Sequence, residues 1–422
     1  MQLLRKSAVL FLLIGMVLPA WSQAADQAQT RIVDANTRFS FKLFHQLVTQ
    51  TADRNILLAP TGISLTFALL DNGADPETRK EVENTFEFIG LDLKQINEGW
   101  VSLRQALQLV PPKPFSLKPA WMTPQQWKTF RIAPPNGTLI ADSIWLRGIA
   151  FPSSFLNVNQ QYYGADVKRL LATPSPTIQI SRWATGRTRT AMHITPGAMA
   201  NNDFLMVDVT YFHAFWTHNF DGSATKPGPF TLLNGKKKQV PFMHKTEHFE
   251  YFETPKFQAV LLPYSVGARM CVILPSEDSS LAELEQSLTA TNWQNWQHEF
   301  SSRLGHLGLP RFQIETGFDV RAALQGLGVT RAFETFVAFS PIAPVTGAKL
   351  TSAIQKTNIK IDERGTEATS VGMVGGVLGG IIGTIGGSPP KPFEMIVDRP
   401  FFFAIADEKT NQLLFLGAVV EP

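Results

Sequence analysis

The sequence predicts a single domain of the α+β class. Helical periodicity dominates the early part of the chain, as in Ile63–Leu70, whereas strand-like runs such as Phe257–Pro263 and Met270–Leu274 fill the later part. Helices and strands do not alternate as they do in parallel α/β folds. The 422 residues are 44% hydrophobic and contain no interdomain linker, so we expect one large core. Val110–Pro135, rich in proline and tryptophan, is interpreted as a surface insertion.

The first 24 residues have the three parts of a secretory signal peptide. Arg5 and Lys6 precede the apolar run Ala8–Leu18, and the small-residue pattern Ser-Gln-Ala ends at Ala24. We therefore predict a signal peptide at residues 1–24, a mature domain at residues 25–422, and a secreted or periplasmic location. An uncleaved membrane anchor is the alternative, although the apolar run is short for a bilayer span.

Charge and cysteine content give little reason to expect a nucleic-acid or membrane partner. The net charge is only +3, and Lys236–Lys238 follow the hairpin-turn pair Asn234-Gly235, so this basic run is interpreted as a solvated turn. A polyanion site there is a minor alternative. Cys271, the only cysteine, stands among apolar residues and is expected to be a buried thiol, so the mature domain has no internal disulfide.

The sequence contains none of the common catalytic motifs. It has no phosphate-binding glycine loop, paired-cysteine zinc motif, zinc-protease helix or nucleophile elbow. His244 and His248 have helical spacing, but their segment is predicted to be strand and turn, which would separate the two imidazoles. We therefore expect no enzymatic activity, cofactor or metal.

The most informative segment lies between Lys360 and Pro400. An acidic strand-like stretch, IKIDERGTEATS, is followed by the uncharged glycine-rich VGMVGGVLGGIIGTIGGSPP and the apolar FEMIV. The glycine-rich part can neither pack a core nor bind a metal, which predicts an exposed loop between strands. Within this segment the first proline is Pro389, so the first half of the segment could enter a sheet. The period of a strand would place small residues on one face: Thr366, Ala368, Ser370, Gly372, Val374 and Gly376.

These segments resemble the serpins, protease inhibitors whose reactive-centre loop inserts into their own main sheet. The run from Asp362 to Ala368 is similar to the serpin hinge, and Asp398–Phe403 with Leu416-Gly417 is similar to the carboxy-terminal signature. Further motifs follow in the family's order over about residues 30–422: Asn36, Phe39, Phe41, Asn55–Pro60, Ile63-Ser64, Gly73-Ala74, Thr78, Tyr211-Phe212, Trp216, Phe242-Met243, Leu262–Tyr264, Ile273–Pro275, Leu309–Phe312 and Leu327-Gly328.

The resemblance implies the serpin fold, with three β-sheets, eight or nine helices and an exposed reactive-centre loop at about residues 363–397. It also implies suicide-substrate inhibition, in which a target protease cleaves the loop, forms an acyl-enzyme and is trapped when the loop inserts. The expected partner is thus a protease held in a covalent complex, and the protein itself is expected to be a monomer.

Roles for individual residues follow from the same resemblance. The hinge residues are Glu363, Gly365, Thr366, Glu367 and Ala368, where glycine supplies backbone freedom and Thr366 is the first side chain to be buried.

Two further positions lie outside the hinge. Trp216 is expected near Glu363 at the top of the sheet, the region called the breach. Many serpins gate the centre of the sheet with serine, asparagine and histidine, but the matching residues here are Gly62, Asp208 and Gln355. Ala59 stands where these serpins have the first serine of the turn between the strand and the helix. The rate of insertion should differ accordingly.

The loop is about ten residues longer than is usual in the family, which leaves two candidate regions for the scissile bond. Counting forward from the hinge leads to Leu378, Gly379 and Gly380, whereas counting back from Pro400 leads to Pro389. We favour the forward count, because each surplus residue would add about 3.3 Å of slack to the tether. Leu378 is our choice for the residue before the cut.

The composition of the loop predicts the class of target. No lysine or arginine lies between Glu367 and Pro390, and Leu378 is followed by Ile381 and Ile382. This disfavours trypsin-like enzymes and favours serine proteases with apolar pockets, such as elastase-, chymotrypsin- or subtilisin-like enzymes.

Two alternative functions remain open. A non-inhibitory serpin could act as a decoy substrate or binding protein. The loop could also be a membrane or self-association element, because Gly375, Gly379, Gly383 and Gly387 recur every four residues.

Overall fold

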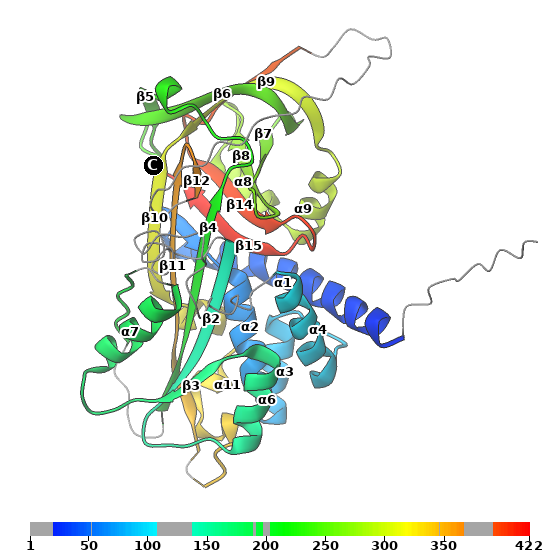
Figure 1. Cartoon of the computed structure of the whole chain (residues 1–422), viewed down its shortest axis with the longest axis vertical. Helices are drawn as coiled ribbons and strands as arrows, with labels where there is room; N and C mark the ends of the chain where they lie inside the picture. The colour runs from blue at the N-terminus through cyan, green and yellow to red at the C-terminus, as the bar shows by residue number, and fades with distance from the viewer. Residues whose placement is uncertain are drawn as a thin grey trace, which may run out of the picture.

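The computed structural model describes residues 20–51, 53–107, 137–188, 191–196, 203–345, 347–366 and 391–422 (Figure 1). The predicted insertion Val110–Pro135 lies outside these residues. So does nearly all of the predicted signal peptide, which stays a prediction; the first helix begins at Ala20, before the expected cleavage after Ala24. None of the described helices is long and apolar enough to cross a membrane.

The described residues contain ten α-helices, slightly more than the eight or nine expected, and the shortest has four residues. Aspartates cap two of them, since the side chain of Asp75 accepts from Thr78 N and Asp92 forms a capping box with Gln95. The helices are α1 (Ala20–Thr51), α2 (Pro60–Asp71), α3 (Pro76–Thr85), α4 (Leu93–Ala106), α6 (Ser153–Tyr163), α7 (Pro176–Thr188), α8 (Leu281–Ser287), α9 (Ala290–Gln297), α10 (Arg321–Leu327) and α11 (Arg331–Glu334).

A six-stranded sheet, which we call the main sheet, runs along the long axis of the molecule (Figure 1). Its order is β10-β11-β12-β4-β2-β3. Strands β4 and β11 are parallel neighbours over most of their length, but the two-residue β12 separates them at one end. The strands are β2 (Gly137–Leu146), β3 (Asp166–Arg169), β4 (Asp203–Phe215), β10 (Phe312–Asp319), β11 (Lys349–Asp362) and β12 (Gly365–Thr366).

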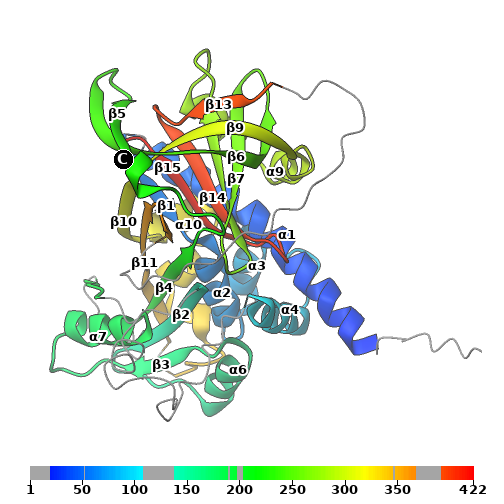
Figure 2. The same ribbon diagram turned by 45° about the horizontal axis from the view of Figure 1, so that its top comes forward.

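The remaining strands form one nine-stranded sheet, seen at the top of Figure 2. The described strands therefore make two sheets rather than three, because the long strand β6 pairs with β5 and β9 along its length and with β7 near its end. The strands are β1 (Ile56–Leu58), β5 (Lys226–Thr231), β6 (Lys237–Glu253), β7 (Phe257–Pro263), β8 (Ala268–Pro275), β9 (Ser301–Pro310), β13 (Phe393–Ile396), β14 (Phe401–Asp407) and β15 (Leu413–Val419).

Several local expectations are confirmed. Ile63–Leu70 lies within α2, and the two predicted strands correspond to β7 and β8. Asn234 and Gly235 form the turn between β5 and β6, with Gly235 at a positive φ of 77°. His244 and His248 both lie on β6, where four residues span about 13 Å, so the two rings cannot share one metal.

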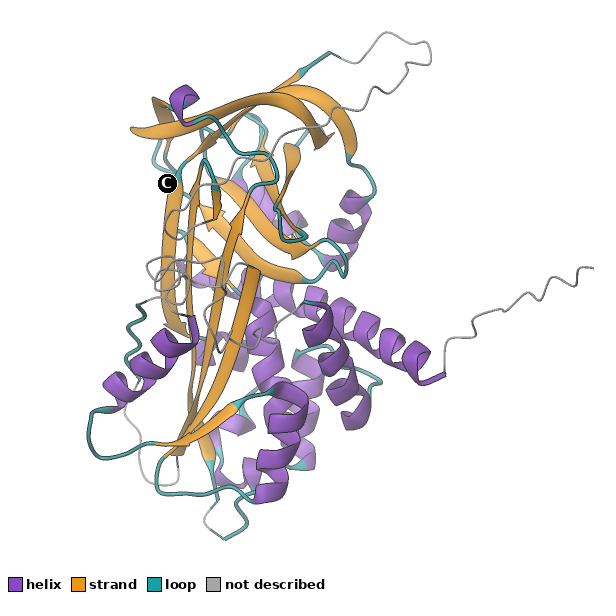
Figure 3. Ribbon diagram, viewed as in Figure 1, coloured by secondary structure: helices purple, strands orange, loops and turns teal. Residues whose placement is uncertain are grey.

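The two faces of the main sheet pack against different helices. Along β4, alternate side chains such as Met206 and Phe212 face the large core that includes α2, whereas Val207 and Val209 face a smaller cluster that includes Trp183 of α7. Figure 3 shows α7 on one side of this sheet and α2 on the other. A segment that enters the sheet must therefore fit a buried layer on both faces.

Cys271 provides a simple test of the packing. It is buried in β8, and burial raises the pKa of its thiol to about 12. We expect the native protein to react with a thiol reagent at pH 8 at least about a hundredfold more slowly than the denaturant-unfolded chain. Comparable rates in the two states would contradict the observed packing of β8.

Candidate functional site

The predicted hinge enters the main sheet at its upper end in Figure 1. Gly365 and Thr366 form β12, which pairs antiparallel with Ala214 and Phe215 of β4 and also with the end of β11. Gly365 has φ 147°, and a Cβ there would lie 2.1 Å from Ala214 O. Only glycine fits this position, because the backbone conformation and the close approach both exclude a side chain.

Thr366 is already buried at the end of the sheet. Its Oγ1 lies 2.7 Å from the hydroxyl of Tyr264, whose ring stacks on Trp216 with centroids 4.3 Å apart. Trp216 in turn donates from Nε1 to Asp362 O at 2.9 Å. The structure therefore brings the predicted hinge and Trp216 together.

Glu363 anchors the turn between β11 and β12. Arg311 donates from Nε to Glu363 Oε1 at 2.7 Å, and Thr225 donates to the same oxygen. Burial alone would raise the pKa of Glu363, but the hydrogen bonds from Arg311 and Thr225 outweigh it and lower the pKa. The carboxylate therefore stays ionised and holds the start of the loop against β10 and the segment before β5.

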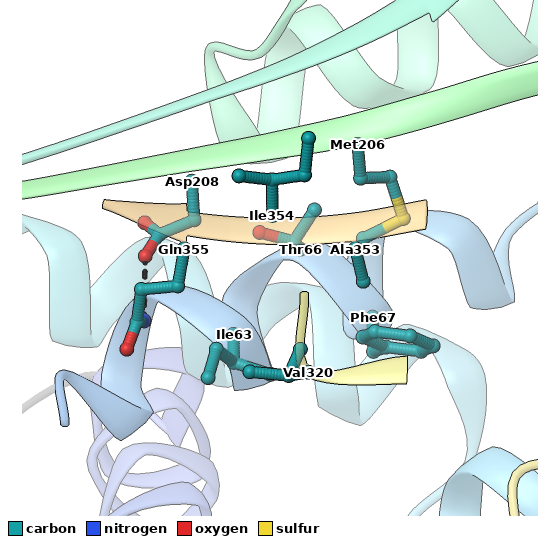
Figure 4. A pocket seen from close by; sticks show the side chains of 9 residues that line it. All are labelled: Ile63, Thr66, Phe67, Met206, Asp208, Val320, Ala353, Ile354 and Gln355. Atoms are coloured by element: carbon teal, nitrogen blue, oxygen red, sulfur yellow. Dashed lines mark hydrogen bonds between the residues drawn. The ribbon is translucent and has the colours of Figure 1, made fainter. Parts of the chain in front are cut away.

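The three predicted gate residues, Gly62, Asp208 and Gln355, meet beneath the centre of the main sheet, and Figure 4 shows Asp208 and Gln355 there. Gln355 of β11 donates from Nε2 to Asp208 Oδ1 of β4 at 2.8 Å and to Ala59 O at 2.7 Å. The backbone N–H of Ala59 returns a hydrogen bond to Gln355 Oε1 at 3.0 Å. One amide side chain thus ties β11 to β4 and to the start of α2.

Gly62 makes room for this arrangement. A Cβ at Gly62 would lie 2.1 Å from Asp208 Oδ2, so the carboxyl group occupies the space that a side chain on α2 would fill. A small cavity adjoins the gate between α2 and the sheet, and it is lined by residues that include Ile63, Met206 and Asp208 (Figure 4). The gate has little spare volume, but it is not completely filled.

The carboxyl group of Asp208 is in an unusual environment. Burial raises its pKa well above the usual value, and Asp142 raises the pKa further, while hydrogen bonds from Gln355 and Thr210 act against the rise. Asp142 lies directly opposite Asp208 in the antiparallel pairing of β2 with β4. Burial raises the pKa of Asp142 to about 7, against the effects of Thr66 and Arg104.

Other predicted positions lie outside the described residues: Glu367, Ala368, Leu378, Gly379, Gly380, Ile381, Ile382, and the glycines that recur every four residues. Within the described part of the chain, no group of three or more metal-ligating side chains gathers that could hold an ion.

The sequence matches the family described as serpin (serine protease inhibitor) over residues 34–422. The chain belongs to the serpin family. Serpins are in general protease inhibitors rather than catalytic enzymes, although the family includes non-inhibitory members such as thyroxine-binding globulin.

Similar proteins come from distant organisms. The chain is 26% identical to human serpin A12 over 411 residues, covering 95% of this chain and 90% of that protein, and 26% identical to mouse antithrombin-III, covering 95% and 83%. Among solved structures, native tengpin, a thermophilic serpin, matches with a TM-score of 0.76 at 25% identity, covering 92% of this chain and 94% of that one. Human thyroxine-binding globulin has a TM-score of 0.78 at 23% identity, covering 94% and 99%. The predicted serpin fold is confirmed.

Sequence reasoning missed the partners that hold the serpin hinge and gate. Tyr264 and Arg311 lie in motifs that were recognised, but nothing in the sequence links them to Thr366 or Glu363, which are far away along the chain. No sequence motif pointed to Asp142, because its position opposite Asp208 depends on the register of β2 against β4.

Replacement of Gly62 tests the gate geometry. Alanine usually stabilises a helix relative to glycine, but Gly62→Ala places a methyl group on the Asp208 carboxyl and should destabilise the protein by about 1–3 kcal/mol. Gly186→Ala in α7 is the matched control, because a Cβ there meets nothing within 4 Å, and it should be neutral or stabilising. Denaturant unfolding measures both. Equal effects of the two substitutions would be incompatible with the tight contact at Gly62.

Proposed function

We propose that this serpin is a suicide-substrate inhibitor of a serine protease with an apolar specificity pocket. The observation that carries the proposal is β12, a strand of the loop that already lies between β4 and β11. Thr366 at its end is buried, and the glycine-rich part of the loop begins at Val371, five residues further on. The entrance for insertion is therefore open at the hinge, while Gln355 holds the sheet closed at its centre.

The register of β12 predicts where the rest of the loop would fit. Each further loop residue would pair one residue earlier on β4 and on β11, which places Gly372 opposite both Asp208 and Gln355. Residues at even positions would share the face of Thr366, toward the core. They are small from Ala368 to Gly376, so insertion would create no steric clash on that face.

The same count indicates how far insertion can go. Val377 would pair with Asp203, the first residue of β4. A bulge between Leu350 and Ser352 places Lys349, the first residue of β11, level with Asp203, so the paired part of the loop would end at Val377. The length of the sheet thus supports Leu378 as the residue before the cut. In the acylation step, the protease serine Oγ forms an ester with the Leu378 carbonyl carbon as the peptide bond to Gly379 breaks and leaves a free amine.

Insertion provides the driving force. About ten net backbone hydrogen bonds would form, at roughly 1 kcal/mol each, and apolar burial would add to them. The attached protease is pulled to the far end of the sheet before water can hydrolyse the ester. The intact protein is accordingly held in its less stable form by a kinetic barrier.

Incubation with a panel of proteases tests this proposal. Elastase, chymotrypsin or subtilisin should form an SDS-stable complex with the protein, mass analysis should locate the cut after Leu378, and trypsin should form none. The cleaved protein should melt at least about 10 °C above the intact protein. Cleavage without a complex would instead support a decoy or binding role, and absence of a rise in melting temperature would exclude loop insertion altogether.

Thr366→Arg tests the hinge, because a long charged side chain cannot replace a threonine that is buried against Tyr264. We expect the yield of covalent complex to fall at least about tenfold, while cleavage by the same protease continues. Thr384→Arg is the matched control, since residue 384 follows the expected cut and does not enter the sheet. Equal loss of complex in both variants would count against insertion from the hinge.

The proposed place of action is outside the cytoplasm, in the secreted or periplasmic fraction. This proposed location rests on the predicted signal peptide at residues 1–24. Amino-terminal sequencing of the exported protein should begin at Ala25, and recovery of uncleaved protein in the membrane fraction would favour an anchor instead.

A further inference from the structure

The gate contains a second acid that the three predicted residues do not include. Asp142 of β2 pairs directly with Asp208 of β4, and directly opposed residues of an antiparallel pair have Cβ atoms about 4.5–5.5 Å apart. Both carboxyl groups are buried and face α2, because Thr66 Oγ1 donates to Asp142 and Gly62 makes room for Asp208. The two groups therefore share one buried site above a single turn of α2.

The charges around this site do not balance two ionised carboxylates. Arg104 of α4 is the cation that acts on Asp142. Arg104 also interacts electrostatically with Tyr163 of α6, and Tyr163 in turn with Asp71 of α2. The nearer partners from β11, β4 and α2 are the uncharged donors Gln355, Thr210 and Thr66.

Lys356 lies next to Gln355 but forms an ion pair with Glu315. Two negative charges at this spacing in a buried site are costly, so the pair is expected to retain a proton near neutral pH.

We propose that Asp142 is a positioning residue of the gate, which shares a proton with Asp208 and thereby makes insertion of the loop depend on pH. This inference rests on the proposed function, since it concerns the step in which β4 separates from β11. It assigns a role to Asp142 that acts through Asp208 and not through contact with the loop or the protease.

The direction of the effect follows from the hydrogen bonds. Insertion places Gly372 between Asp208 and Gln355, two strand spacings or about 9–10 Å apart, so Gln355 no longer reaches the carboxyl group. The lost hydrogen bond was one that favoured the ionised form of Asp208. The open sheet, in which this hydrogen bond is broken, therefore binds more protons than the closed sheet, so opening is favoured as pH falls and insertion slows as pH rises through the range in which the acid pair loses its proton.

Uptake of a loop peptide by the intact protein measures insertion without a protease. The probe is an acetylated and amidated peptide with the sequence of residues 367–378, EATSVGMVGGVL, whose only ionisable side chain is a glutamate that titrates near pH 4 in peptides. Native mass spectrometry follows the rate of incorporation from pH 6 to pH 8.5. We expect the rate for the wild-type chain to fall on the order of tenfold over this range.

Three variants separate a proton-linked role from a structural one. Asp208→Asn should remove the pH dependence. Asp142→Asn should move the midpoint to lower pH, because it removes the like charge beside Asp208. Asp71→Asn is the matched control, since Asp71 is also a buried acid of α2 with its pKa raised to about 8 by burial, yet its ion pair is with Arg79 and not with a gate residue. This control should keep the wild-type pH profile.

The outcomes distinguish this inference from the proposed function. Incorporation at a rate that is constant from pH 6 to pH 8.5, or a pH dependence that survives in both Asp208→Asn and Asp142→Asn, overturns the role of the acid pair alone. Absence of incorporation at every pH, together with no rise in melting temperature after loop cleavage, overturns loop insertion and this inference with it. If Asp208→Asn fails to fold, as judged by its melting curve, the shifted midpoint of Asp142→Asn decides.

Discussion

The parallel pairing of β4 with β11 is the constraint on which the rest of the structure depends. Two parallel neighbours can accept an antiparallel strand between them, because each has a row of backbone groups that can pair with it. At one end of the sheet β12 has already taken this place, and at the centre the Gln355 side chain holds the two strands together. In the closed sheet, therefore, β4 and β11 could still pair with a further strand between them along the rest of their length.

The balance between these two arrangements explains why a few side chains matter so much. The closed form is held at the gate by a small number of hydrogen bonds, each worth about 1 kcal/mol, whereas the proposed full insertion would form about ten backbone hydrogen bonds. On the proposed mechanism, such a gate does not make the closed form the more stable one. It can only set the height of the barrier to opening, so its residues control a rate.

Much of the hinge could be predicted from sequence because its signals are local. The spacing of Glu363, Gly365 and Thr366 and the small residues that follow are visible in one segment, and in the structure these three residues lie together at one end of the main sheet. The partners of these residues could not be predicted. Tyr264 and Arg311 meet the hinge only through the folded chain, and the union of two sheets into one depends on the path of β6.

The gate needs empty space in both of its states, and glycine supplies it in each. In the closed sheet, Gly62 leaves room for the Asp208 carboxyl, which a side chain on α2 would displace. In the inserted sheet, the register would bring Gly372 between Asp208 and Gln355, where it adds no side chain that would compete with either of them for space. An acid in the gate is thus compatible with insertion because residues far apart in the sequence, one on α2 and one in the loop, both lack a Cβ.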